Sequence, residues 1–374
     1  MIQSRWDPRS PSANLDCLRA IAVLAVVGCH TLLTLGYKPP DAACVFGVIL
    51  FFVHTSLVLM SSLERIERTD APLFSTFYLR RLFRIYPLSI FCVTVIVLFQ
   101  LPRAPWWPWS SPDAFTILTN LSLSMNLFYK AEVTSVLWSL PLEVQMYVFL
   151  PVLYLIGKKH RLKGVALTWI GAVAAALVLP SISGRLSIAS FGPCFVAGVA
   201  TYFLGFKVPH PRLPFVGWLL MIGSGLFLYS YASTFIEVDI ANWLLSLWIG
   251  LSAPFFVELR QAAVKRIAEL IARYSYGIYL THLQVLWFAF IVLKDHAKPV
   301  QYGTFALLGI GVPILLYHLV EHPMIRFGMK LTAGRALGAE KQPHAGGEKA
   351  TAAIKRKGKL PRESRSRWPR HAQP

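Results

Sequence analysis

Apolar residues occur in repeated blocks, and each block is about 18 to 22 residues long, the length that crosses a bilayer as one α-helix. Short polar or basic stretches separate the blocks. The pattern predicts membrane spans at residues 15–36, 42–63, 85–101, 137–157, 164–180, 188–206, 214–231, 240–258, 274–293 and 302–323. We therefore expect an all-α polytopic membrane protein with about ten transmembrane helices.

One further apolar segment, AFTILTNLSLSMNLF at residues 114–128, is short and carries asparagines and serines. If it crossed the membrane, the basic loop KKHRLK at residues 158–163 would lie outside, against the excess of positive charge in cytoplasmic loops. We therefore expect this segment to be re-entrant or interfacial, with both chain termini cytoplasmic. This topology puts 31 of the 37 lysines and arginines inside and only six outside, namely Lys38, Arg103, Lys130, Arg185, Lys294 and Lys298.

The formal net charge of +19 is not evidence for a nucleic-acid partner. The basic residues lie in short loops and in the tail, as the positive-inside rule predicts, so the expected macromolecular surroundings are membrane lipids. We expect a cytoplasmic segment at residues 1–14, one membrane-embedded domain at 15–323, and a basic cytoplasmic tail at 324–374. The composition of that tail cannot bury a core, so it is expected to be disordered.

The five cysteines all lie in or beside the apolar blocks, at positions Cys17, Cys29, Cys44, Cys92 and Cys194. None belongs to a C-x-x-C pair. The spacing therefore predicts neither a disulfide framework nor a metal site, and the cysteines are interpreted as small packing residues.

The first apolar block carries two ionisable residues, Arg19 and His30. Eleven residues are close to three helical turns, so both side chains project from one face, about 16 Å apart along the axis. Such groups are costly in lipid unless they face a bundle interior or a wet cavity, which points to function. The alternative is that Arg19 reaches the cytoplasmic interface and His30 is a packing residue.

Four further ionisable residues lie in or beside membrane spans. Arg81 and Arg84 are spaced i, i+3 at the start of the third span, where they repel each other unless an anion lies between them. Two guanidiniums in this arrangement bind phosphate well, although ordinary positive-inside charge is the alternative. Glu143 lies near the outer end of the fourth span. A glutamate inside a membrane span rarely has a purely structural role, which makes Glu143 a candidate functional residue. Glu321, at the inner end of the last span, could neutralise one of the cytoplasmic arginines.

Cations at the cytoplasmic end, with a histidine and a possible carboxylate partner deeper in, suit a long donor that has phosphates at one end. Coenzyme A thioesters have this shape. The arginines would hold the phosphates, and the acyl group would arrive near His30. A neutral imidazole can then take the proton from an acceptor hydroxyl.

Six stretches together resemble the acyltransferase-3 family of bacterial integral-membrane acyltransferases, which includes O-antigen and exopolysaccharide O-acetylases. In chain order they are LDCLRAIAVLAVVGCH, FFVHTSLVL, FYLRRLFRIYP, LWSLPLEVQMYVFLP, YSYGIYLTH and VEHP, extending from Leu15 to Pro323. The arginine–ten residues–histidine spacing of the family maps onto Arg19 and His30, and its R-x-x-R onto Arg81 and Arg84.

The resemblance implies transfer of an acyl group, usually acetyl, from cytoplasmic acyl-CoA to a hydroxyl of a cell-surface carbohydrate or lipid-linked glycan. It implies a multi-pass protein of the bacterial inner membrane with His30 as catalytic base. We add Glu143 as a second catalytic candidate and Arg19, Arg81 and Arg84 as donor-binding residues. No permanently bound cofactor and no metal are expected. The rival hypothesis is a proton-coupled secondary transporter or exporter, in which His30, Glu143 and Glu321 relay protons and the arginines bind an anionic solute.

Overall fold

The computed structural model describes residues 12–69, 71–206 and 213–340, with side chains up to residue 333. All regular elements in this part of the chain are helices. The long ones are α1 (Ala13–Thr34), α2 (Asp41–Glu67), α3 (Leu73–Leu98), α5 (Ser139–Ile182), α6 (Gly192–Gly205), α7 (Phe215–Ala232), α8 (Val238–Ser252), α9 (Ala262–Trp287), α10 (Lys298–Leu316) and α11 (His322–Glu340). Shorter ones are α4 (Ala114–Leu121), η1 (Met125–Phe128), η2 (Ser135–Trp138), η3 (Gly184–Phe191), η4 (Ala253–Phe255), η5 (Phe288–Val292) and η6 (Tyr317–Glu321).

Within the described residues, nine helical segments are long and apolar enough to cross a membrane, against the ten spans expected. The difference arises in α5, where the backbone at Arg161 leaves the helical region (φ 54°, ψ −146°). A straight helix as long as α5 would be roughly twice as long as the hydrocarbon core is thick. The two halves of α5 therefore correspond to the separate spans predicted at 137–157 and 164–180. The all-α multi-pass architecture is confirmed.

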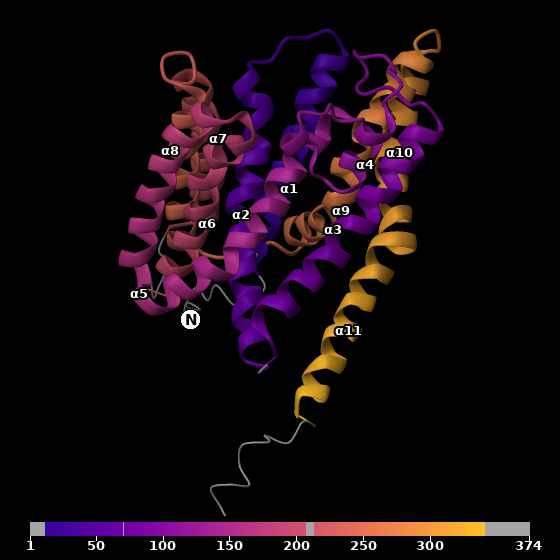
Figure 1. Cartoon of the computed structure of the whole chain (residues 1–374). Coiled ribbons are helices and arrows are strands. Elements are labelled where there is room, and N and C mark those ends of the chain that lie inside the picture. Colours follow the sequence, from indigo (N-terminus) through magenta and orange to yellow (C-terminus); the bar gives the residue numbers. More distant parts are fainter. Residues whose placement is uncertain (1–11, 70, 207–212, 341–374) are drawn as a thin grey trace, which may run out of the picture.

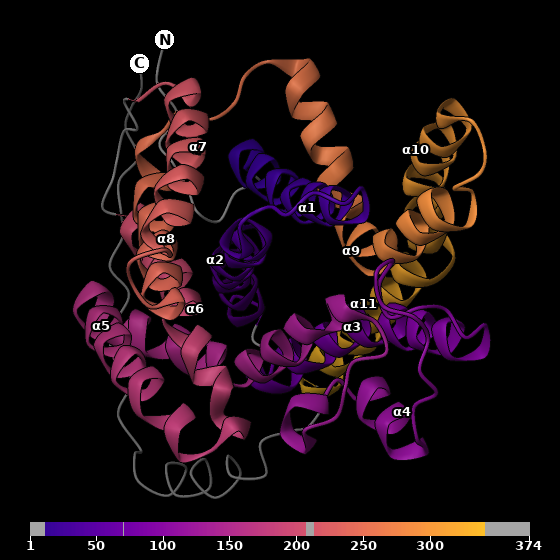
Figure 2. The same ribbon diagram turned by 90° about the horizontal axis from the view of Figure 1, so that it is seen from above.

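Helices α1 and α2 lie in the middle of the bundle, with α6, α7 and α8 on one side and α3, α9 and α10 on the other (Figures 1 and 2). Close packing in the centre depends on small residues, because these let helix backbones approach. A Cβ atom at Gly47 would lie 2.4 Å from the carbonyl oxygen of Ala22, and one at Gly198 would lie 2.2 Å from that of Val53. Glycine at these two positions allows α2 to pack against both α1 and α6.

The start of α1 is fixed to a distant part of the chain. Ser12 caps the helix by accepting a hydrogen bond from the Leu15 amide, and its hydroxyl donates to Glu258 at 2.5 Å. The Asn14 side-chain amide donates to the Val257 carbonyl, and its oxygen accepts from the Leu259 amide. These bonds hold α1 next to the segment that precedes α9, so α1 and α9 run side by side.

The segment at residues 114–128 does not form a membrane-crossing helix. It consists of the eight-residue α4 and the single turn η1. Asn120 is fully buried, where its side chain donates to the carbonyls of Thr116 and Ala131 and accepts from the amide of Val133. Asp113 caps α4, and its hydrogen bond from Lys130 holds the pKa of that carboxyl well below its usual range.

Four details of the sequence prediction are corrected. Helix α3 begins at Leu73, twelve residues before the expected span, so the arginines at 81 and 84 lie within the helix. Helix α9 begins at Ala262, twelve residues before the span expected at 274–293. Helix α11 extends to Glu340, into the expected tail, of which residues 341–374 lie outside the described part. Cys29 and Cys44 form a disulfide, because the turn after α1 brings the two helix ends together, with Cα atoms 5.3 Å apart.

Candidate active site

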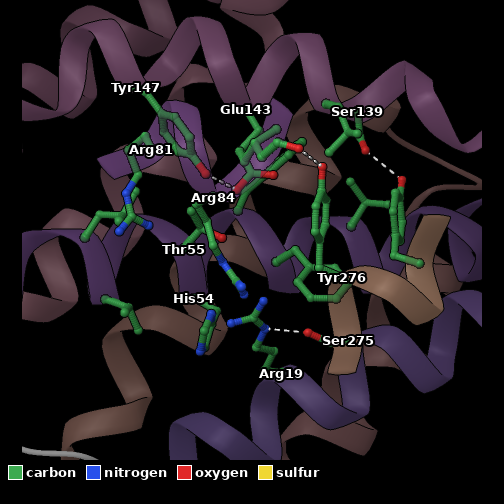
Figure 3. A pocket seen from close by; sticks show the side chains of 18 residues that line it. Arg19, His54, Thr55, Arg81, Arg84, Ser139, Glu143, Tyr147, Ser275 and Tyr276 are labelled. Carbon is green, nitrogen blue, oxygen red and sulfur yellow. Dashed lines mark hydrogen bonds between the residues drawn. The ribbon is translucent and has the colours of Figure 1, made fainter. Parts of the chain in front are cut away.

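A cavity of about 100 Å³ lies inside the bundle between α1, α2, α3, α5 and α9. Its polar lining is rich in cations and hydroxyl groups, and comprises Arg19, His54, Thr55, Arg81, Arg84, Ser139, Glu143, Tyr147, Ser275, Tyr276 and Tyr279 (Figure 3). Ionisable side chains in an apolar bundle are costly to bury, so their collection around one cavity makes it the candidate functional site.

Three arginines from two helices converge on this cavity. Arg19 of α1 donates from Nε to the Ser275 hydroxyl of α9 at 2.7 Å, and Figure 3 shows its guanidinium pointing toward that of Arg84. Arg84 of α3 forms an ion pair with Glu321, which is 1% exposed. Arg81 forms no ion pair with the described residues, and its buried Nε makes no hydrogen bond there. The cluster therefore has more positive charge than the one ion pair neutralises, which favours binding of an anion.

A second hollow, of about 290 Å³, lies on the other side of Arg19 and Arg84, which line both spaces. Its other walls are Asp16, Glu269, Ala272, Arg273 and Tyr317. These residues belong to the first turn of α1, the first half of α9 and the start of η6. Arg19 and Arg84 thus separate the inner cavity from a polar mouth at the end of the bundle that carries the start of α1.

His30 lies outside this cavity, toward the opposite end of α1. Its Nδ1 is 2.7 Å from Nε2 of His282 on α9, and its ring is tilted against that of Trp106 at a centroid distance of 5.8 Å. Tyr279 lies between the cavity and the histidines: it lines the cavity, and its ring centroid is 6.1 Å from that of His282. The Tyr279 hydroxyl donates to the Val136 carbonyl and accepts from Ser139 at 2.6 Å, so the side chain is fixed between the cavity and the histidines.

Glu143 does not lie beside His30. Its carboxylate lines the cavity with the arginines and accepts a 2.5 Å hydrogen bond from the Tyr147 hydroxyl. The expectation that a carboxylate partners the histidine is therefore wrong for this structure. The predicted residues separate into two groups: Arg19, Arg81, Arg84 and Glu143 around the cavity, and His30 beyond Tyr279.

Sequence reasoning missed the contribution of α9. Ser275, Tyr279 and His282 all come from the stretch YSYGIYLTH, and each contacts a residue of the candidate site. Their spacing of i, i+4 and i+7 puts them on one helix face. This spacing was visible in the sequence, but nothing local showed that the face turns toward α1.

The architecture and the cavity define a polytopic membrane protein with a cationic site in its interior. A family model described as an acyltransferase domain matches residues 12–318, which is most of the chain. The chain therefore belongs to the acyltransferase-3 family, as its motifs predicted.

Similar curated proteins come from Staphylococcus aureus strains COL, MSSA476 and MRSA252, and each bears the name "Putative O-acetyltransferase". Each is 27% identical over 355 residues, covering 85% of this chain and 58% of the relative. The chain thus spans little more than half the length of these relatives. No solved structure shows a significant match.

Proposed function

We propose that this protein is a membrane-bound O-acyltransferase that moves an acetyl group from cytoplasmic acetyl-CoA to a hydroxyl of a cell-surface or exported carbohydrate. The observation that carries this proposal is the arginine cluster between the inner cavity and the polar mouth, together with a pair of histidines on α1 and α9 toward the other end of α1. Membership of the family and the names of the relatives support the reaction class.

The positive charge of the three arginines indicates where the acyl-CoA donor binds. The polar mouth admits the nucleotide end of the donor, and Arg81, Arg84 and Arg19 bind its phosphates. Guanidinium groups are well suited to this, because they offer several donors in a planar fork and remain charged. The phosphates supply negative charge that the two carboxylates, Glu321 and Glu143, do not provide for three guanidinium groups. The pantetheine arm then extends through the cavity toward Tyr279.

Transfer requires the thioester to reach His30. Because Tyr279 lies between the cavity and the histidines, we propose that its side chain moves away from Ser139 and the Val136 carbonyl when the arm arrives. His30 Nε2 accepts the proton of the acceptor hydroxyl as the oxygen attacks the thioester carbonyl. The carbon–sulfur bond then breaks, CoA leaves as the thiolate, and the proton on His30 neutralises it.

The proposed topology puts the mouth in the cytoplasm and His30 near the outer face of the bacterial inner membrane. The excess of lysine and arginine in the loops at the mouth end supports this orientation. The Cys29–Cys44 disulfide supports it too, because disulfides persist in oxidising compartments and this one lies next to His30 in the chain.

The test is a transfer assay with the purified full chain in proteoliposomes, [¹⁴C]acetyl-CoA as donor and octyl glucoside as a soluble hydroxyl acceptor. We expect release of CoA together with label on the glucoside, and loss of both in His30→Ala. Accumulation of label inside the vesicles with no release of CoA would support a transporter instead. Absence of both label transfer and CoA release would contradict the proposed donor.

A further inference from the structure

We propose that His282 is the positioning residue of the His30 base: its Nε2 accepts a hydrogen bond from Nδ1–H of His30, so that Nε2 of His30 is the unprotonated nitrogen that faces the substrate. This inference rests on the proposed function. It concerns a residue outside the arginine cavity, and it follows from the hydrogen bonds around two imidazole rings.

The first step is the geometry of the pair. The planes of the two rings are inclined to each other by 11°, and the ring centroids are 5.0 Å apart. Nδ1 of His30 lies 2.7 Å from Nε2 of His282. The centroid separation exceeds the nitrogen–nitrogen distance by about the width of one ring. The rings therefore meet edge to edge, with the hydrogen near the line that joins the two nitrogens, which is the arrangement of a strong hydrogen bond.

The second step fixes the proton on His282. Its Nδ1 lies 2.8 Å from the carbonyl oxygen of Tyr279 and 3.1 Å from that of Ile278. Carbonyl oxygens can only accept, so Nδ1 of His282 carries a hydrogen. His282 is 3% exposed, and a second proton would bury an imidazolium whose hydrogen-bond partners are a neutral ring and two carbonyls. His282 is therefore neutral, and its Nε2 is an acceptor.

The third step derives the tautomer of His30 from that of His282. Because Nε2 of His282 has no hydrogen, Nδ1 of His30 must donate in the 2.7 Å bond. A neutral imidazole carries one N–H, so Nε2 of His30 holds a lone pair. This nitrogen makes no hydrogen bond with the described residues, and His30 is partly exposed, next to Trp106, which is 41% exposed. The unprotonated nitrogen therefore points away from His282, and the ring that carries it is partly accessible.

The fourth step concerns the reaction. When His30 takes a proton at Nε2, its Nδ1–H becomes the donor of a charge-assisted hydrogen bond to His282, which stabilises the cation. A partner that holds the base in one tautomer works in the same way in serine hydrolase triads, where a carboxylate has this role. Here the neutral His282 has this role, and the backbone carbonyls of α9 in turn fix the tautomer of His282.

The test compares three substitutions of His282. The amide oxygen of Gln can reach the position of the imidazole Nε2 and accept from His30, whereas Asn is too short and Ala has no acceptor. With acetyl-CoA and octyl glucoside, we expect kcat to fall by about 10- to 100-fold in His282→Ala and His282→Asn, with KM for acetyl-CoA unchanged. His282→Gln should recover most of the rate. His318→Gln, a histidine outside both hollows, is the matched control and should behave as wild type.

Nitrogen-15 spectra of histidine-labelled protein provide a readout that does not need turnover. In the wild type, the His30 signals, assigned by their loss in His30→Ala, should show a protonated Nδ1 and a bare Nε2. In His282→Ala or His282→Asn they should become a mixture of tautomers. An unchanged single tautomer, or equal rates in the Gln, Asn and Ala variants, overturns the inference. If the wild type fails to release CoA, the proposed function fails, while the spectra still decide the tautomer of His30.

Discussion

Arg84 on α3 and Glu321 at the end of η6 form an ion pair that joins the third helix to the last membrane span. The Glu321 side chain is 1% exposed, and its second oxygen, Oε2, makes no hydrogen bond with the described residues. The sequence predicted that Glu321 neutralises one of the cytoplasmic arginines without deciding which. Because of this pairing, we expect the three arginines that line the cavity to respond differently to substitution.

Arg84→Ala should destabilise the protein as well as weaken donor binding, because it leaves a buried carboxylate without its partner. Removing one member of a buried ion pair costs about 3–5 kcal/mol. We expect the double variant Arg84→Ala/Glu321→Gln to recover much of that loss, as measured by thermal unfolding of the purified protein. A double variant no more stable than Arg84→Ala would show that the pair does not hold α3 in place.

Arg81→Ala should affect donor binding with little effect on stability, since Arg81 has no carboxylate partner among the described residues. Losing charge-assisted hydrogen bonds to a phosphate should raise KM for acetyl-CoA about 10- to 100-fold. Arg81→Lys should recover only part of the affinity, because it replaces a planar fork by a point charge. Arg80→Ala is the control on the same helix, since Arg80 donates to Thr332 instead of lining the cavity. If the Arg81 and Arg80 variants bind acetyl-CoA equally well, Arg81 does not bind the donor and contributes only to the positive charge of the cytoplasmic side.

His30→Ala should abolish transfer while the protein still inserts and binds acetyl-CoA. The expected loss is about 10²- to 10⁴-fold in kcat, the usual contribution of a positioned general base. In the wild type, kcat should also fall on acidification, because a protonated imidazole cannot accept a proton. Near-normal turnover in His30→Gln would mean that His30 is a packing residue and that the base lies elsewhere.

Glu143→Gln separates two roles for this carboxylate. In the structure it lines the same cavity as Arg19, Arg81 and Arg84 and does not lie beside His30. We therefore expect kcat to stay within a few-fold of wild type, and KM for acetyl-CoA to fall, because the amide no longer repels the phosphates. Steady-state kinetics with varied acetyl-CoA measures both. A loss of 10²-fold or more in kcat at unchanged KM would instead support the acid–base role predicted from the sequence.

The proposed topology is tested by labelling single cysteines in intact cells and in inverted vesicles. Trp107→Cys and Lys298→Cys should react from outside. His160→Cys and Ala345→Cys should react only from the cytoplasmic side, although position 345 lies outside the described residues. Labelling of position 160 from outside would mean that the two halves of α5 have the opposite orientation.

The spans and the alignment of Arg19 with His30 followed from the sequence, for a local reason. A segment that crosses lipid must be long, apolar and helical, and helical periodicity then decides which side chains share a face. Residues 114–128 were too ambiguous to decide by length and polarity, and the excess of positive charge in cytoplasmic loops predicted that they do not cross. The family motifs, which extend over most of the membrane domain, also gave the class of protein.

Only the tertiary structure decided which faces meet. Periodicity does not say which helix lies next to α1, and the close approach at Gly47 and the attachment of Asn14 to Val257 and Leu259 are contacts between residues far apart in the chain. These contacts give His30 a histidine partner instead of a carboxylate, because they put the His282 face of α9 against α1 and leave Glu143 among the arginines of α3. The partner of a buried ionisable group is set by the packing of whole helices, which no local pattern in the sequence records.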